Sequence, residues 1–322
     1  MLTFQENVSL APFTTFRIGG PARYFVSVEN LEELKVALKK AMESSWPIFI
    51  LAGGSNLIIS SAGFAGLVIH IQMVSCGVEE QHIISGAGTQ MATVVDASIE
   101  AGLAGLEWAG GLPGTLGGAI RGNAGAFGGE IKDVVEAVSS VDYQSGELIN
   151  RKNDECQFSY RGSIFKQNAH EVIVSASLIL KPGNKEHLRQ IANDHIHYRQ
   201  HRHPLELPNA GSIFKNTPVE KIPAHILPQF KEVIKDDPFP VVPTAKIIAD
   251  SGCAGLTIGG SQVSTRHTNY IVNLGTGTGE EILQLINAVK ARVRDKFGIE
   301  LEVEPELVGF GPVDHAAAAV LK

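Results

Sequence analysis

The chain has 322 residues, of which 44% are hydrophobic and 19% are charged, and this length accommodates about two domains with sizeable cores. Its net charge of −7 argues against a nucleic-acid partner, because binding to nucleic-acid phosphates would need a basic face. The three widely spaced cysteines, Cys76, Cys156 and Cys253, fit neither a disulfide framework nor a zinc site. The first residues contain no basic segment followed by an apolar one, so we expect a cytoplasmic protein without membrane association.

Hydrophobic periodicity predicts the elements of the N-terminal half. A helix begins after Asn30, which can cap it, and places leucines three and four residues apart on one face. Residues 48–52 form a short apolar run that predicts a strand buried on both faces, ending at the turn Gly53-Gly54-Ser55-Asn56. A second strand is expected over residues 67–71, and a helix over residues 91–99.

Later elements are bounded by turn and capping signals. Residues 142–146 predict a hairpin turn, and an apolar strand is expected over residues 172–180. The Lys-Pro-Gly-Asn segment at 181–184 then indicates a boundary before a second domain. In that domain, a capping box predicts a helix from Thr278 to Gly298, and alternation over residues 301–307 predicts a half-buried strand.

The most unusual segment is residues 102–129, which contain 11 glycines in 28 residues. Glycine has no Cβ, so such a segment can offer its main chain directly to a ligand. The third glycine of a Rossmann fingerprint and the lysine of a Walker A motif are both missing, so any nucleotide must be held by another arrangement. Together with Gly53-Gly54 and Gly86-Ala87-Gly88, the segment would suit the pyrophosphate of a dinucleotide. A single glycine pair would more simply be a tight turn, whereas three such loops favour a ligand.

Six motifs carry a resemblance to a known family. They are NVSLAPFTTFRIGGPA at 7–22, LAGGSNL at 51–57, GGLPGTLGG at 110–118 with NAGAFG at 123–128, FSYRGSIF at 158–165, NAGSIFKN at 209–216 and EPE at 304–306. In this order they resemble the UDP-N-acetylenolpyruvoylglucosamine reductase family, flavoenzymes of peptidoglycan precursor synthesis. The interval between Arg161 and Ser212 is too short for the inserted, tyrosine-bearing segment of the larger family form, so the chain resembles the compact form.

The resemblance implies an α+β fold. An FAD-binding part of the vanillyl-alcohol-oxidase (PCMH) type would consist of two subdomains, residues 1–74 and 75–182. A C-terminal α+β substrate-binding domain would follow at 183–310, and a tail at 311–322. The implied cofactor is non-covalent FAD, NADPH is the implied hydride donor, and the implied partner is a UDP-sugar substrate, with no protein partner evident.

The implied reaction reduces an enolpyruvyl ether to a lactyl ether. NADPH reduces FAD, and the flavin then passes hydride to C3 of the vinyl group, which places charge at C2 beside the carboxylate. By the resemblance, Arg161 would neutralise the carboxylate, Ser212 would supply the proton to C2, and Glu306 would help Arg161 polarise the carboxylate. Without the resemblance, Ser212 would be interpreted as a turn serine and Glu306 as a solvated carboxylate.

The resemblance also assigns binding residues. The residues expected to bind FAD are Gly53, Gly54, Ser55, Asn56, Leu57, Gly110, Gly111, Pro113, Gly114, Thr115, Gly118, Asn123, Gly125 and Ala126. Those expected to bind the substrate are Tyr160, Arg199, Arg202, Lys215 and Asn216. No metal is expected: His197 and His201 share a helical face, but the glutamate of the zincin motif is missing.

Two alternatives stay open. Another FAD oxidase or dehydrogenase of the same fold would act on an alcohol or lactone and would not need to protonate an enolate carbon. A non-catalytic nucleotide-sugar-binding protein would show no flavin colour. Arg161, Ser212 and Glu306 together argue against the oxidase. An absorption spectrum followed by anaerobic addition of NADPH tests the enzyme interpretation, because a colourless protein that binds no FAD would exclude it.

Overall fold

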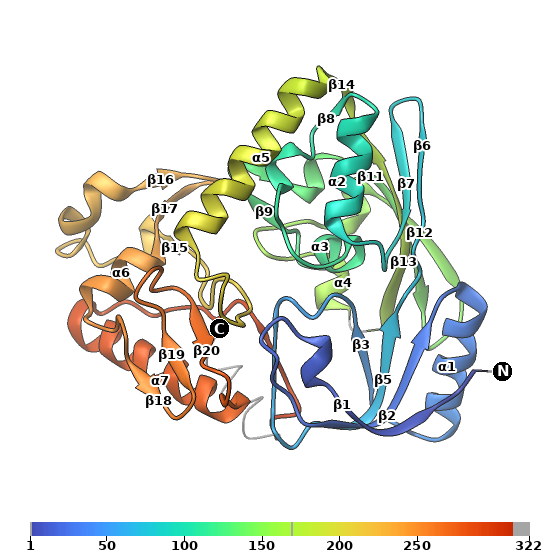
Figure 1. Cartoon of the computed structure of the whole chain (residues 1–322), viewed down its shortest axis with the longest axis horizontal. Helices are drawn as coiled ribbons and strands as arrows, with labels where there is room; N and C mark the ends of the chain where they lie inside the picture. The colour runs from blue at the N-terminus through green and yellow to red at the C-terminus, as the bar shows by residue number, and fades with distance from the viewer. Residues whose placement is uncertain (1, 169, 312–322) are drawn as a thin grey trace. The chain divides into compact units, whose positions relative to one another are not determined.

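The computed structural model describes residues 2–168 and 170–311 and divides into two compact units (Figure 1). Unit 1 consists of Met1–Val8, Ala22–Gly53 and Ala65–Arg199, and unit 2 of Ser9–Pro21, Gly54–Phe64 and Gln200–Lys322. Both units are therefore discontinuous in sequence, whereas the boundaries predicted from sequence are contiguous and remain predictions. From residue 312 on, the predicted tail lies outside the described residues.

The first sheet of unit 1 has the strand order β1-β2-β5-β3. Its strands are β1 (Gln5–Ser9), β2 (Pro21–Val28), β5 (Phe64–Ile71) and β3 (Ile48–Leu51). Helix α1 (Leu31–Glu43) begins after Asn30, whose side chain accepts from the Glu33 N–H, and it shares a core with β2 and β5 (Figure 1). The predicted helix is confirmed. The expectation that β3 is buried on both faces is wrong, because β3 is an edge strand paired only with β5, and of its residues only Leu51 is buried.

The second sheet of unit 1 has the strand order β12-β11-β13-β7-β6 and is antiparallel throughout. Its strands are β6 (Cys76–Glu79), β7 (His82–Gly86), β11 (Val135–Asp142), β12 (Leu148–Lys152) and β13 (Glu171–Ile179). The predicted hairpin turn is confirmed: the Asp142 carboxylate accepts from the N–H groups of Gln144 and Ser145, each at 2.9 Å. The predicted strand over 172–180 corresponds to β13.

Short elements and helices complete unit 1. Helices α2 (Met91–Glu100) and α3 (Leu116–Arg121) contact β7. The other elements are α4 (Ile164–Gln167), α5 (Lys185–Arg202), the pairs β8 (Leu103–Ala104) with β14 (Lys181–Pro182) and β9 (Gly125–Ala126) with β10 (Gly129–Glu130), and 3-10 turns at Glu107–Ala109, Ile131–Asp133 and Asn153–Cys156. The Pro-Gly interruption at 181–184 thus joins β14 to α5, and unit 1 continues to Arg199.

Unit 2 is built around its longest helix, α7 (Gly279–Phe297). Thr278 and Glu281 form the predicted capping box, and Gly298 ends the helix at φ 66°, so this prediction is confirmed. The other elements are α6 (Thr244–Asp250), the sheet β15 (Thr217–Pro218), β17 (Pro240–Val242) and β16 (Lys235–Asp236), the sheet β18 (Thr257–Ile258), β19 (Ser261–Val263) and β20 (Ile271–Asn273), the parallel pair β4 (Leu57–Ile59) and β21 (Glu306–Val308), and 3-10 turns at Ala11–Phe13, Val219–Lys221 and Leu227–Val233.

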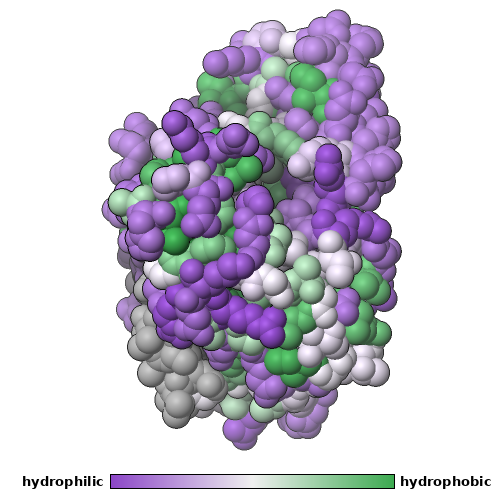
Figure 2. Space-filling model, turned by 90° about the vertical axis from the view of Figure 1, so that its left-hand side faces the viewer, coloured by the Kyte–Doolittle hydropathy of each residue, from purple (hydrophilic) through white to green (hydrophobic). Residues whose placement is uncertain are grey.

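The predicted strand over 301–307 is only partly present. Strand β21 covers Glu306–Val308, and before it Val303 makes an isolated bridge with Phe214. Pro305 has no N–H and cannot continue a ladder, which separates the two pairings. On the face shown in Figure 2, hydrophobic residues form separate patches among hydrophilic ones. Over residues 2–168 and 170–311, every helix is too short or too polar to cross a bilayer.

Candidate active site

The candidate site residues are distributed over both units. Unit 1 carries Gly53, Gly110, Gly111, Pro113, Gly114, Thr115, Gly118, Asn123, Gly125, Ala126, Tyr160, Arg161 and Arg199. Unit 2 carries Gly54, Ser55, Asn56, Leu57, Arg202, Ser212, Lys215, Asn216 and Glu306.

In unit 1, two glycine loops meet main chain to main chain. Gly53 follows β3, and a Cβ placed on it would lie 2.6 Å from the Cα of Gly114. Gly114 itself has φ 98°, a conformation that favours glycine. After it, Thr115 caps α3 by accepting from the Gly118 N–H at 3.5 Å. The close approach shows that the two glycines make room for each other's main chain. Around this contact the two loops consist largely of backbone, whose N–H groups would suit a phosphate-bearing cofactor such as FAD.

Asn123 holds the loop that follows α3. Its side chain is fully buried, with Oδ1 accepting from the Lys132 N–H at 3.2 Å and Nδ2 donating to the Ser159 carbonyl at 2.8 Å. The amide therefore faces protein on both sides and fixes the main chain of the adjacent Gly125 and Ala126.

Arg161 lies at the tip of a tight turn. Ser159 and Gly162 close the turn with two main-chain hydrogen bonds of 3.0 and 3.1 Å, and Arg161 has φ 57°. Its guanidinium lies 5.0 Å from the ring centroid of Tyr160, and Nη2 donates to the Gly125 carbonyl at 2.9 Å. The turn therefore presents Tyr160 and Arg161 together and ties the arginine to the loop after Asn123.

In unit 2, main-chain hydrogen bonds link the Ser212 segment with the Glu306 segment. Directly after Ser212, the Ile213 carbonyl accepts from the Glu304 N–H at 2.9 Å, and Lys215 N–H donates to the Glu302 carbonyl at 2.9 Å. The Glu306 N–H donates to the Asn56 carbonyl at 3.0 Å, and β21 pairs with β4 at Leu57. The structure therefore pairs the main-chain segments that carry the predicted proton donor, the predicted carboxylate and two predicted cofactor residues.

The predicted basic residues differ in their surroundings. Arg199 on α5 donates from Nε to the Gly110 carbonyl at 3.0 Å, and its guanidinium lies 5.2 Å from the ring centroid of Phe127. Arg202, the last residue of α5, is exposed. Lys215 forms an ion pair with Glu302, so its charge is compensated within unit 2. Arg199 thus supports the glycine loop.

Asn216 also has a protein partner, because its Oδ1 accepts from the Thr244 N–H at 3.3 Å.

The sequence interpretation missed Phe127, whose ring stacks on His195 with 3.9 Å between centroids. Burial lowers the pKa of His195, and the charge of Arg199 lowers it further. Phe127 belongs to the NAGAFG motif, so the motif itself was the available signal. In the described part of the chain, no cluster of three His, Cys, Asp or Glu side chains is suited to a metal ion.

The fold and these loops define an α+β FAD-binding protein with a C-terminal α+β domain, as predicted. Residues 22–151 match the FAD binding domain family, and residues 203–308 match the family described as UDP-N-acetylenolpyruvoylglucosamine reductase, C-terminal domain. A UDP-N-acetylenolpyruvoylglucosamine reductase of Solibacter usitatus is 35% identical over 311 residues, covering 96% of this chain and 97% of the relative. One of Lactobacillus delbrueckii is 36% identical, with 96% of each chain covered.

A solved structure agrees with these relatives. The UDP-N-acetylenolpyruvylglucosamine reductase (MurB) of Thermus caldophilus superposes with a TM-score of 0.75 at 29% identity, covering 96% of this chain and all of that one. The chain therefore belongs to the UDP-N-acetylenolpyruvoylglucosamine reductase family. It is an FAD-binding oxidoreductase of peptidoglycan precursor synthesis.

Proposed function

We propose that the chain reduces UDP-N-acetylglucosamine enolpyruvate to UDP-N-acetylmuramate, with NADPH as the hydride donor. The observation that carries this proposal is the pairing of the Ser212 segment with the segment leading to Glu306 in unit 2. Both segments lie within the region matched by the family's C-terminal domain, residues 203–308. Reduction of a vinyl ether needs a hydride, a proton and a stabiliser of the intervening charge, and the chain offers a candidate for each protein-borne role.

When bound, FAD supplies to C3 of the substrate the hydride that it has taken from NADPH. The remaining steps fall to side chains of this chain. Negative charge develops at C2 and spreads into the neighbouring carboxylate, where the Arg161 guanidinium stabilises it with charge-assisted hydrogen bonds. The Ser212 hydroxyl then donates its proton to C2, which completes the saturated lactyl ether. Glu306 assists by polarising the same carboxylate together with Arg161.

The local geometry of Arg161 supports its proposed role. Its Nη2 is held by the Gly125 carbonyl at 2.9 Å, and Tyr160 lies beside the guanidinium plane. An arginine oriented before substrate arrives loses less conformational entropy when it binds a carboxylate. Arg161 therefore suits recognition of a carboxylate better than a freely rotating surface arginine would.

The binding residues are proposed on the same basis. We assign FAD to the main chain of Gly53, Gly54, Ser55, Asn56, Leu57, Gly110, Gly111, Pro113, Gly114, Thr115, Gly118, Asn123, Gly125 and Ala126. We assign the nucleotide sugar to Tyr160, Arg199, Arg202, Lys215 and Asn216. The glycine contacts would supply backbone donors for the pyrophosphate, and Arg199 and Arg202 would supply charge for the substrate diphosphate, since the charge of Lys215 is compensated by Glu302.

The test separates the two half-reactions. In the Ser212→Ala variant, anaerobic NADPH should still bleach the flavin, whereas reoxidation by the enolpyruvyl substrate should slow by about 10²–10⁴-fold, the contribution of a general acid. Ser251→Ala is the matched control, because Ser251 ends α6 and its hydroxyl donates to the Ile248 carbonyl. Unchanged reoxidation in Ser212→Ala removes the serine from its role. A purified protein without flavin absorbance refutes the reductase function as a whole.

A further inference from the structure

Asn269 forms an unusual set of contacts with the residues that follow Ser212. It lies in the turn between β19 and β20 and is 4% exposed. Its Oδ1 accepts from the Phe214 N–H at 3.0 Å, and its Nδ2 donates to the Phe214 carbonyl at 2.8 Å. In addition, its main-chain carbonyl accepts from the Ile213 N–H at 2.8 Å. One residue therefore holds main-chain groups of the two consecutive residues directly after Ser212.

The opposite edge of this short segment is held by the chain that leads to Glu306. Glu304 N–H donates to the Ile213 carbonyl, and Phe214 forms a bridge with Val303. The segment after Ser212 thus lies between true main-chain pairing on one side and the Asn269 side chain on the other. Because an amide offers both a donor and an acceptor, asparagine can replace a missing strand at that edge.

The residue before Ser212 is a glycine whose N–H donates to Asn209 Oδ1 at 3.0 Å. Gly211 has φ 76°, and a Cβ placed on it would meet no atom within 4 Å. Glycine allows a wider range of backbone conformations than any other residue, so the direction of the Ser212 side chain depends strongly on how Ile213 and Phe214 are held. Asn269 holds both of them.

We propose that Asn269 is a positioning residue for protonation of the substrate. Its side-chain amide fixes the backbone of Phe214, and its main-chain carbonyl holds the Ile213 N–H, so that the Ser212 hydroxyl is directed at the carbon that takes the proton. This inference rests on the proposed function, in which Ser212 is the proton donor. It adds a residue outside the six family motifs that acts through Ser212.

The test uses the FAD-loaded protein and measures each half-reaction by anaerobic stopped flow. In Asn269→Asp and Asn269→Ser, flavin reduction by NADPH should stay within twofold of the original protein. Reoxidation by UDP-N-acetylglucosamine enolpyruvate should slow by about 10–100-fold, because a displacement of about 1 Å can cost about 10²-fold. Neither variant leaves a large cavity, and if one fails to fold, the other still provides the measurement.

The pH dependence of flavin reoxidation in Asn269→Asp provides a second measurement, which distinguishes a positioning role from a purely structural one. An ionised aspartate accepts from the Phe214 N–H but repels the Phe214 carbonyl, whereas a protonated aspartate can donate to that carbonyl as asparagine does. Measured against the original protein at each pH, reoxidation in Asn269→Asp should therefore recover as the pH is lowered from 8 to 6.

Asn273→Asp is the matched control. Asn273 is 3% exposed, and its side chain holds the N–H groups of Gly275 and Gly277 and the Phe16 carbonyl. This variant should lose stability and keep both half-reaction rates. Normal reoxidation in the Asn269 variants, equal slowing of both half-reactions, or equal slowing in Asn273→Asp would overturn the inference. If Ser212→Ala is slow while the Asn269 variants are normal, only this inference fails; if Ser212→Ala is normal, the proton donor of the proposed function fails.

Discussion

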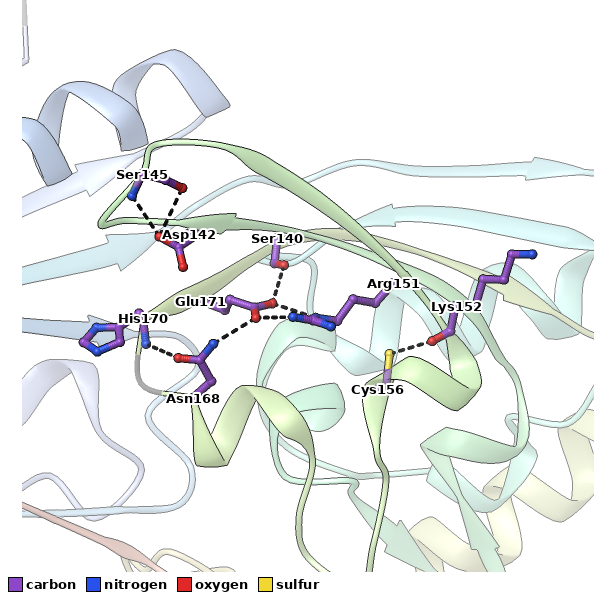
Figure 3. Close-up of polar contacts among 9 residues, drawn as sticks. All are labelled: Ser140, Asp142, Ser145, Arg151, Lys152, Cys156, Asn168, His170 and Glu171. Atoms are coloured by element: carbon purple, nitrogen blue, oxygen red, sulfur yellow. Dashed lines mark hydrogen bonds and ion pairs between the residues drawn. The ribbon is translucent and has the colours of Figure 1, made fainter.

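Replacement of Glu171 by glutamine tests how unit 1 supports the segment that carries Arg161. The Glu171 side chain is 1% exposed at the start of β13 and accepts from Arg151 Nε at 2.9 Å and Nη2 at 2.5 Å (Figure 3). It also accepts from Ser140 Oγ and from Asn168 Nδ2, each at 3.0 Å. Asn168 follows α4, which begins three residues after Arg161. The carboxylate therefore joins three strands of the sheet to the end of this segment.

The expected loss of stability follows from this geometry. Removal of one partner from a buried ion pair costs about 3–5 kcal/mol. The Arg151 side chain is 24% exposed, so water partly compensates the guanidinium, and we expect about 3 kcal/mol at pH 7. Glutamine preserves the volume and creates no cavity. For a unit of this size, about 3 kcal/mol corresponds to a melting temperature lower by about 6–12 °C.

The pH dependence has a definite sign. The Arg151 guanidinium, as the main cause, holds the pKa of Glu171 below its usual value. The stabilisation is therefore complete above the unfolded-state pKa of about 4.3 and is lost as the pH falls through the lower folded-state pKa. Glutamine does not titrate, so the melting temperatures of the original protein and Glu171→Gln should converge as the pH falls from 7 toward 3.

Differential scanning calorimetry of both proteins over this pH range provides the measurement. Glu136→Gln is the control, because Glu136 lies on the same sheet but its side chain is 45% exposed, and exposed ion pairs contribute about 1 kcal/mol or less. A loss below about 1 kcal/mol for Glu171→Gln at pH 7, or a difference independent of pH, would show that the ion pair does not hold the sheet as argued.

Three further predictions concern single positions. Gly211→Ala places a Cβ at φ 76° and should lower the free energy of unfolding by about 1–2 kcal/mol. It should also slow flavin reoxidation, because it changes the direction of the Ser212 side chain. An unchanged melting temperature would contradict this prediction. Arg161→Lys removes the planar guanidinium, which can bind both oxygens of a carboxylate. Steady-state NADPH oxidation should show kcat/KM for the enolpyruvyl substrate lowered by about 10–100-fold. A smaller loss would exclude recognition of the carboxylate through two hydrogen bonds. Burial raises the pKa of Cys156 to about 11, whereas Cys76 is only partly buried. Iodoacetamide at pH 8 should therefore alkylate Cys76 before Cys156, which peptide mass spectrometry can measure. Equal labelling would show that Cys156 is accessible.

Elements whose ends are encoded locally could be predicted from sequence. Helix α1 begins at Asn30 and helix α7 runs between Thr278 and Gly298, and each of these residues acts through contacts within one turn of the helix. The strand β3 itself could be predicted, over residues 48–52, but its burial could not, because burial depends on the order of strands in the sheet and not on the strand's own apolar residues. The discontinuous units have the same origin, since distant segments are joined only by tertiary pairing such as that of β4 with β21.

In the candidate site, too, residues in local motifs could be proposed from sequence, whereas their tertiary contacts could not. Ser212 and Glu306 lie in contiguous motifs and could be proposed through the family resemblance that these motifs carry. Asn269 could not, because its partner Phe214 is 55 residues away in sequence and the contact exists only after β19 and β20 have folded back on the Ser212 segment. The Lys215–Glu302 ion pair spans 87 residues and was missed for the same reason. Partners that hold catalytic segments are therefore the part of a site that only the fold reveals.

The glycine-rich segment shows why composition alone overstates ligand contact. A Cβ on Gly110 would lie 2.4 Å from the Ala192 carbonyl oxygen, and one on Gly129 would lie 2.3 Å from Cδ1 of Trp108. These glycines make room for protein, whereas a Cβ on Gly128 would meet no atom within 4 Å. Substitution at Gly110 or Gly129 should therefore disturb packing before it disturbs cofactor binding. A run of glycines predicts a close approach to the main chain, and only the fold shows whether protein or cofactor is the group that approaches.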